Sequence, residues 1–132
     1  MSCREGVVKV ADTVAELRAK NSSTVILVTS AGMGKAEEAL QHRLLGIYLK
    51  MLKENEFIPG AICFYGDGVK MVVEGSPVLD LLHELERKGV RLIICTTCLQ
   101  YFALEERVAV GIVGGMHDIL LAQWMADKVI TL

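Results

Sequence analysis

Short apolar runs alternate with amphipathic stretches from residue 24 to the end of the chain. Runs rich in aliphatic and β-branched residues, each bounded by polar or turn-forming residues, cover 25–28, 61–65, 90–94, 109–113 and 128–132. Continuous apolar runs of this length are typical of strands that are buried on both faces of a parallel sheet. The pattern therefore predicts five strands.

The longest segment between these runs has the periodicity of a helix. In residues 35–55, the apolar positions that recur along one side of a helix are Leu40, Leu44, Ile47 and Met51. Side chains spaced in this way form a single stripe on a helix of about 3.6 residues per turn. We expect this stripe to pack on the sheet.

A second helix is predicted after Ser76 and Pro77, because a hydroxyl group caps a helix and proline fits its first position. Gly89 is expected to end this helix in a left-handed conformation. Its predicted buried positions are Val78, Leu81, Leu82 and Leu85. Two further helices are predicted over 99–107 and 116–126.

Alternation of strands and helices favours parallel crossover connections. The predicted fold class is α/β, a three-layer α/β/α sandwich with flavodoxin-like layering of helices on both faces of the sheet. The chain divides into an N-terminal extension, residues 1–23, and one domain, residues 24–132. A length of 132 residues suits a single core of this kind.

Charge and hydropathy argue against two classes of partner. The chain has 14 Lys and Arg against 16 Asp and Glu and contains no basic run, so no nucleic-acid partner is expected. The most apolar region, 109–125, is interrupted by three glycines, His117, Asp118 and Gln123, so no membrane-spanning helix or membrane partner is expected. Residues 1–13 lack the apolar core of a secretory signal. We expect a cytoplasmic protein.

The cysteines supply the candidate chemistry. Cys95 and Cys98 form a CxxC spacing directly after the predicted strand 90–94. Helix N-termini converge at the carboxyl ends of parallel strands, and their N–H groups and dipole favour a thiolate. The spacing thus predicts a pair of reactive thiols, and a buried structural pair is the alternative. Cys63, inside an apolar run, is expected to pack as a small hydrophobic side chain.

Two other loops, 30–35 and 66–70, are predicted to reach the same edge of the sheet. Their candidate residues are Gly32, Gly34, Lys35, Gly66, Asp67, Gly68 and Lys70. A phosphate-binding loop is disfavoured, because Thr29 stands at its first glycine position and Ala36 where Ser or Thr is required. The dinucleotide fingerprint fails at Glu37, although an anion site at the helix N-terminus stays open.

Other uses of the CxxC are also disfavoured. Zinc needs four ligands, and no second paired motif accompanies the first, so neither a metal nor another cofactor is expected. A thioredoxin-like dithiol would follow an early strand, whereas this one follows the third. His117 begins the last predicted helix and is a candidate for modulating a thiolate, with capping or solvent exposure as the alternative.

Several segments resemble the DsrE/DsrF-like family of small sulfur-relay proteins, and more specifically the DsrE-like C-terminal domain of YedF-type proteins associated with selenium metabolism. The resemblance covers residues 24–132. Its most specific parts are 64–70, 74–78, 85–90, 95–99 and 126–132.

This resemblance implies a five-stranded parallel sheet with helices on both faces. It also implies a homo-oligomer, either a trimer or hexamer or a smaller form such as a dimer. In the family, a cysteine directly after the third strand carries sulfane sulfur as a persulfide. Cys95 stands at that position, and Cys98 is the extra thiol of the YedF-like subgroup.

The leading hypothesis is therefore sulfur relay. Cys95 would accept sulfane sulfur from a protein or small-molecule persulfide donor and pass it to an acceptor thiol. Cys98 would either displace sulfide from the Cys95 persulfide, leaving a disulfide, or act as a second carrier. A catalytic sulfurtransferase and a stoichiometric carrier both fit this chemistry.

The negative sulfur needs stabilising groups. Backbone N–H groups of Thr97, Cys98 and Leu99 are the first candidates, and Lys70 and Lys35 are weaker ones. Two other classes of function stay open. One is a non-enzymatic, oligomeric binding or redox-sensing module that uses the Cys95/Cys98 dithiol. The other is a structural protein with inert cysteines.

Overall fold

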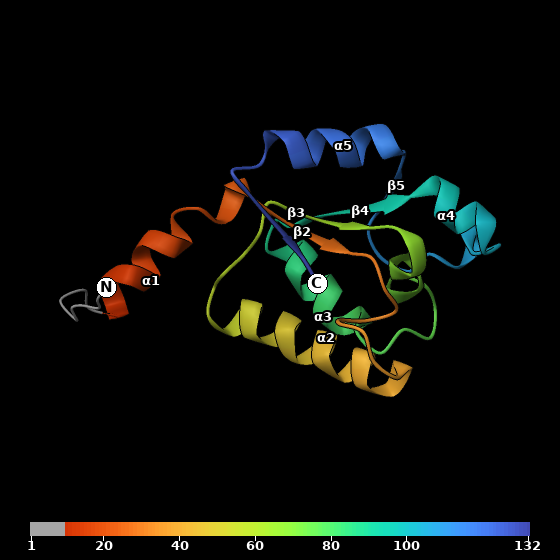
Figure 1. Ribbon diagram of the computed structural model, residues 1–132, viewed down its shortest axis with the longest axis horizontal. Helices are drawn as coiled ribbons and strands as arrows, with labels where there is room; N and C mark the ends of the chain where they lie inside the picture. The colour runs from red at the N-terminus through yellow and green to blue at the C-terminus, as the bar shows by residue number, and fades with distance from the viewer. Residues whose placement is uncertain (1–9) are drawn as a thin grey trace.

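Five parallel strands form one sheet in the computed structural model, which describes residues 10–132 (Figure 1). The strands are β2 (Thr24–Val28), β3 (Ala61–Phe64), β4 (Arg91–Cys95), β5 (Ile112–Gly114) and β6 (Lys128–Thr131). Their order is β5-β4-β3-β2-β6, and every neighbouring pair is parallel. This arrangement confirms the predicted α/β class and the five-stranded parallel sheet.

The three central strands form the core of the molecule. All four residues of β3 are buried, as are the last four residues of β2 and of β4. Side chains from both faces of these strands are covered, which explains why the runs are apolar without alternation. The edge strands β5 and β6 are mostly exposed.

The predicted strand 109–113 is wrong at its start. Residues 107–109 pair instead with 72–74, through Glu74 N–H to Arg107 O at 2.9 Å and Ala109 N–H to Val72 O at 2.8 Å. Gly111 then takes a left-handed φ of 88°, where an added Cβ would lie 2.9 Å from the Ile94 side chain. Because of this separate pairing, β5 begins only at Ile112.

Helices lie on both faces of the sheet (Figure 1). One face carries α2 (Glu38–Glu54) and α3 (Leu79–Arg87), which pack against each other. Along the other face, the described chain places α5 (Met116–Met125), which contacts β4 and β5. A 3-10 helix, η2 (Gly66–Met71), and α4 (Thr96–Tyr101) lie at the carboxyl ends of the strands.

The predicted packing stripe of α2 is wrong. Its four residues, Leu40, Leu44, Ile47 and Met51, are 36–54% exposed, and the buried residues are Leu45, Leu49 and Leu52. The exposed and the buried residues both have the spacing of one side of a helix, so spacing alone does not identify the packed side. The contacts at the start of the helix select between the two sides. Gln41 makes these contacts: its carbonyl accepts the Met33 N–H at 3.0 Å and its side-chain amide donates to Gly34 O at 2.7 Å. The helix begins at Glu38 rather than at 35.

The prediction for α3 is confirmed in its buried face. Val78, Leu82 and Leu85 are at most 2% exposed, and Leu81 is half-buried. The Ser76 hydroxyl accepts the Val78 N–H at 3.3 Å, so it caps the turn that leads into the helix.

The predicted helix 99–107 is wrong in its bounds. α4 starts at Thr96, immediately after β4, and ends before Ala103, which has a left-handed φ of 56°. The Leu104 N–H bonds to Leu99 O across this turn, the pattern of a helix C-terminus. A separate 3-10 turn, η3 (Glu105–Arg107), follows.

Helix α1 (Val10–Arg18) extends away from the sheet (Figure 1). Arg18 joins it to the domain, because its Nε donates to Asn55 O at 2.8 Å and its guanidinium lies over the Phe57 ring. A 3-10 turn, η1 (Asn21–Ser23), then leads into β2. None of the helices described between residues 10 and 132 is long and apolar enough to cross a membrane.

Candidate functional site

The two cysteines of the CxxC lie where β4 passes into α4. Cys95 is the last residue of β4 and the residue directly before α4, and Cys98 lies in the first turn of that helix. A helix that starts without an intervening loop brings residues three apart onto neighbouring positions of one turn. The two thiols are close enough for Cys95 to raise the pKa of Cys98.

The two thiols differ in access to solvent. Cys95 is 0% exposed and belongs to the core, whereas Cys98 is partly exposed. An attacking donor must reach a sulfur atom directly, so access decides which thiol it meets first. Of this pair, Cys98 offers its Sγ atom to a partner.

A backbone amide completes the immediate surroundings of the Cys98 sulfur. The Gly66 N–H, at the start of η2, donates a hydrogen bond to Cys98 Sγ over 3.1 Å. An N–H group that points at a sulfur atom stabilises negative charge on that atom. This amide therefore favours the thiolate or persulfide anion at Cys98.

The pKa of the Cys98 thiol is nevertheless raised above its ordinary value. Burial is the largest cause, and the hydrogen bond with Cys95 and the charge of Cys95 act in the same direction. The Gly66 N–H lowers the pKa but does not outweigh them. At neutral pH, Cys98 is thus mainly a thiol, and its reactivity grows as the pH rises.

Glycines determine how closely η2 approaches the end of β2. An added Cβ on Gly68 would lie 2.0 Å from the Val28 carbonyl oxygen, and one on Gly66, whose φ is 59°, would lie 3.3 Å from Thr29 O. Only glycine fits this contact without a shift of the backbone. Loop 66–70 was predicted to meet the CxxC. It does so through Gly66, whose N–H bonds to Cys98.

The other predicted loop serves α2 rather than the thiols. A Cβ on Gly32 would lie 2.3 Å from the Gln41 backbone, and Gly34 O accepts the hydrogen bond of the Gln41 side chain. Lys35 is exposed beside them. Within the part of the chain that the structure describes, no hydrogen bond or ion pair joins this loop to Cys95 or Cys98.

Two other predicted contributors to the site are Lys70 and His117. The Lys70 ammonium forms an ion pair with Asp67 at 2.8 Å and lies 4.5 Å from the centre of the Phe102 ring. His117 is an exposed residue in the first turn of α5. Among residues 10–132, the structure gives neither Lys70 nor His117 a hydrogen bond to the thiols.

The remaining predicted residues lie on α4 itself. Thr97 is exposed and the Leu99 side chain is 0% exposed, so only their backbone N–H groups are relevant to a charged sulfur. A contact that the sequence did not indicate involves Thr96, whose hydroxyl donates to Gly114 O at 2.9 Å and ties α4 to β5. The glycine-rich turn 64–68 was visible in the sequence. The residue to which the Gly66 amide bonds, Cys98, is 32 positions further along the chain.

Cys63 is a buried core residue, as predicted. It is 0% exposed in the middle of the sheet, and burial raises the pKa of its thiol to about 11, with Arg91 opposing the shift. A thiol with such a high pKa stays protonated and unreactive at neutral pH. No cluster of three or more metal-ligating side chains occurs among the described residues.

The sequence profile of the DsrE/DsrF-like family matches residues 22–132. Thus the match includes the whole sheet and the CxxC. None of the curated proteins compared with the sequence matches it.

Solved structures with the same fold come from bacteria and an archaeon. The YchN protein of E. coli superposes with a TM-score of 0.60 at 16% identity, over 83% of this chain and 99% of that one. The conserved protein of unknown function BT1422 from Bacteroides thetaiotaomicron gives 0.62 at 14% identity, over 86% and 97%. The protein of unknown function MTH1491 from Methanobacterium thermoautotrophicum gives 0.60 at 15% identity, over 83% and 97%.

Proposed function

Because the chain belongs to the DsrE/DsrF-like family, we propose that it is a cytoplasmic sulfur-relay protein whose Cys95/Cys98 pair receives and hands on sulfane sulfur. The observation that carries the proposal is the partly exposed Cys98, whose Sγ accepts the Gly66 N–H and whose pKa is raised by the neighbouring Cys95. The second cysteine of the CxxC is the reason to place the chain nearest the YedF-type members of the family.

The geometry favours Cys98 Sγ as the sulfur atom that meets the donor. The Cys98 thiolate attacks the outer sulfur of a donor persulfide, the donor S–S bond breaks, and the donor leaves as a thiolate. Cys98 then holds the sulfur as a persulfide. An acceptor thiolate attacks the outer sulfur of this persulfide, takes it over, and returns Cys98 to its thiolate form.

Cys95 has a different role in this order of events. From its buried position it attacks Cys98 Sγ, the S–S bond of the Cys98 persulfide breaks, and hydrosulfide leaves. The product is a Cys95–Cys98 disulfide, which an external thiol must reduce before the next cycle. Hence Cys95 releases sulfide when no acceptor takes the sulfur.

The sequence alone favoured the opposite order, in which Cys95 accepts the sulfur. Intact-mass spectrometry separates the two orders after incubation of wild type, Cys95→Ser and Cys98→Ser with a small-molecule persulfide. If Cys98 is the acceptor, Cys95→Ser gains one sulfur atom, about 32 Da, that reductant removes, whereas wild type without an acceptor releases sulfide and loses two hydrogens. In that case Cys98→Ser gains none.

Each of the other results has a defined meaning. Loading of Cys98→Ser but not of Cys95→Ser would assign the acceptor role to Cys95. Equal loading of both variants and of the double variant would refute sulfur relay on this pair. If wild type loses two hydrogens without releasing sulfide, and Cys95→Ser gains no sulfur, the dithiol is a redox couple. The placement of both thiols at the start of α4, where Cys95 acts on the pKa of Cys98, favours that redox-sensing module as the second candidate function.

A further inference from the structure

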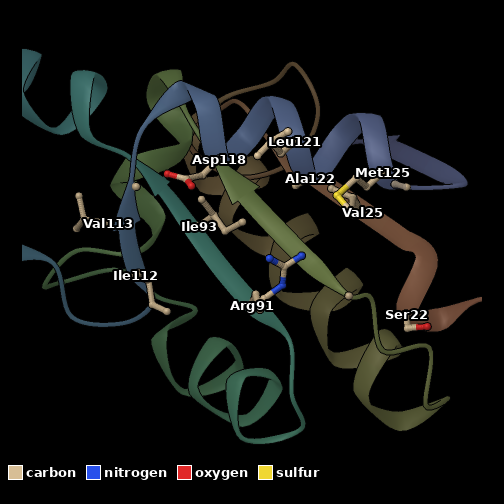
Figure 2. Close-up of a pocket in the computed structure, with 13 residues that line it drawn as sticks. Ser22, Val25, Arg91, Ile93, Ile112, Val113, Asp118, Leu121, Ala122 and Met125 are labelled. Atoms are coloured by element: carbon tan, nitrogen blue, oxygen red, sulfur yellow. The ribbon is translucent and has the colours of Figure 1, made fainter.

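A pocket lies between α5 and the strands β4 and β5 (Figure 2). It encloses about 630 Å³, and its walls include the apolar side chains of Ile93, Ile112, Leu121 and Met125. Small-molecule sites are concave, have volumes of about 300–1,000 Å³, and are mostly apolar with a few polar groups that orient the ligand. The polar groups of this pocket therefore indicate the class of ligand that fits it.

Arg91 supplies a positive charge to the pocket. It begins β4, and its side chain projects from the strand toward α5 (Figure 2). The guanidinium lowers the pKa of the Cys63 thiol against the effect of burial, so its charge acts over the neighbouring strand β3. Between residues 10 and 132, no group forms a hydrogen bond or an ion pair with this guanidinium. Its planar set of N–H donors is left for an anion and matches the geometry of a carboxylate.

Asp118 supplies a negative charge at the other end of the pocket. It lies in the first turn of α5, beside Gly114, which pairs in register with Cys95 at the end of β4. Its carboxylate accepts the Gly115 N–H at 2.9 Å and forms no ion pair with Arg91. A second anionic group on a ligand would meet like charge at this end. The pocket therefore favours one anionic group at Arg91 and a neutral remainder.

We propose that this pocket binds a small molecule with an apolar chain and a single terminal carboxylate, which Arg91 holds. From Arg91 to Cys95, beside which Gly114 lies, β4 spans about 13 Å at about 3.3 Å per residue. A saturated chain of about ten carbons has this length, since its C–C bonds are about 1.5 Å. The chain lies over Ile93 between α5 and β5. A medium-chain fatty acid has this chemistry.

Isothermal titration calorimetry of the full chain in reductant, with sodium decanoate as the probe, tests the proposal. Decan-1-ol has the same chain without the charge, and decanedioate has a second carboxylate at the far end. We expect decanoate to bind wild type at least about 10-fold more tightly than either, because the alcohol forms no ion pair with Arg91 and the second carboxylate faces Asp118. Neither Cys95 nor Cys98 lines the pocket, so this result is independent of sulfur relay.

Two matched pairs of variants locate the site. Arg91→Gln should weaken decanoate binding at least about 10-fold, because it removes a charged hydrogen-bond donor. Arg87→Gln, on α3 at the other face of the sheet, should leave the affinity unchanged. Leu121→Asp places a carboxylate in the wall of the pocket and should also weaken binding. Leu120→Asp is its control, since Leu120 is equally exposed, 46% against 45%, but does not line the pocket.

Circular dichroism shows whether each variant is folded, and the four substituted residues are exposed. Folded wild type that does not bind decanoate would overturn the proposal. Equal affinities for decanoate and decan-1-ol, or unchanged affinity in folded Arg91→Gln, would also overturn it. So would equal losses in Leu120→Asp and Leu121→Asp, because the ligand would then lie outside the pocket. The comparison of the three ligands on wild type decides the matter even where a variant fails to fold.

Discussion

At the scale of single residues, the Cys95/Cys98 pair combines a buried thiol with an accessible one. The Gly66 N–H draws negative charge onto the accessible sulfur, while burial and the neighbouring Cys95 oppose its ionisation. A sulfur with this balance attacks slowly as a free thiol and becomes more reactive when its pKa falls.

The raised pKa of Cys98 leads to a prediction about alkylation. Because burial and Cys95 raise this pKa, the rate of Cys98 modification by iodoacetamide should still increase with pH above the range in which a free cysteine levels off. Cys95→Ala removes the hydrogen bond and the like charge, so the pH profile should move to lower pH. Peptide mass spectrometry after timed labelling measures Cys98 separately from the other cysteines.

Cys98→Ser is the control in this experiment, since it removes the labelled site. A profile that moves to higher pH in Cys95→Ala would contradict the assigned cause of the shift. An unchanged profile would show that Cys95 does not act on Cys98.

At the scale of elements, η2 is placed by direct contact between backbone segments. Gly68 brings it against the end of β2, and Gly66 brings its first amide to Cys98. Side chains at the ends of this element, including Lys70 with Asp67, are on the surface and add little stability. The close packing of η2 is therefore the part that holds the site amide in place.

Replacing a glycine with alanine should have opposite effects on the free energy of unfolding in η2 and in α2. An added Cβ on Gly68 would lie 2.0 Å from the Val28 carbonyl oxygen. Because this oxygen belongs to the backbone, it cannot rotate away as a side chain can. Gly68→Ala should therefore lower the free energy of unfolding by about 1–3 kcal/mol. Gly46 lies inside α2, and its nearest neighbour, Val78 Cγ1, is at an ordinary distance of 4.0 Å. Gly46→Ala should raise that free energy by up to about 1 kcal/mol.

Urea unfolding of the two variants and wild type measures both effects. Equal destabilisation by both substitutions would argue against the proposed cause. Gly68→Ala should also slow alkylation of Cys98, because it displaces the Gly66 amide that lowers the pKa of this thiol, whereas Gly46→Ala should leave that rate unchanged.

At the scale of the whole molecule, the two faces of the sheet are covered unequally. Helices α2 and α3 pack over one face, while α5 alone lies along the other (Figure 1). On the α5 side, a pocket opens between α5 and the strands β4 and β5 (Figure 2). The edge of the sheet that carries the CxxC is close to this pocket, since Cys95 pairs in register with Gly114, two residues before α5.

Much of the architecture could be predicted from the sequence because it depends on local patterns. The runs that became β2, β3 and β4 are apolar on both faces, so their burial follows from composition alone. Ser76 and the apolar positions of α3 likewise predicted a helix and its buried side. Cys63 was predicted to be a core residue because its neighbours in the chain are apolar.

What failed depended on contacts between separate segments of the chain. The packed side of α2 follows from the contacts of Gln41 with Met33 and Gly34, since the helix has apolar residues on two sides. The start of β5 follows from the pairing of 107–109 with 72–74. Neither contact leaves a periodic pattern in the sequence.

The sequence by itself determined that this is a parallel α/β protein with a CxxC at the carboxyl edge of its sheet, because apolar runs and their alternation with helices are local properties. Only the tertiary structure decided that Cys95 is enclosed, that Cys98 meets the Gly66 amide, and that α5 keeps an apolar side uncovered. These features arise from packing and hydrogen bonds between elements far apart in the chain. A linear pattern does not encode which side chains such contacts leave at the surface.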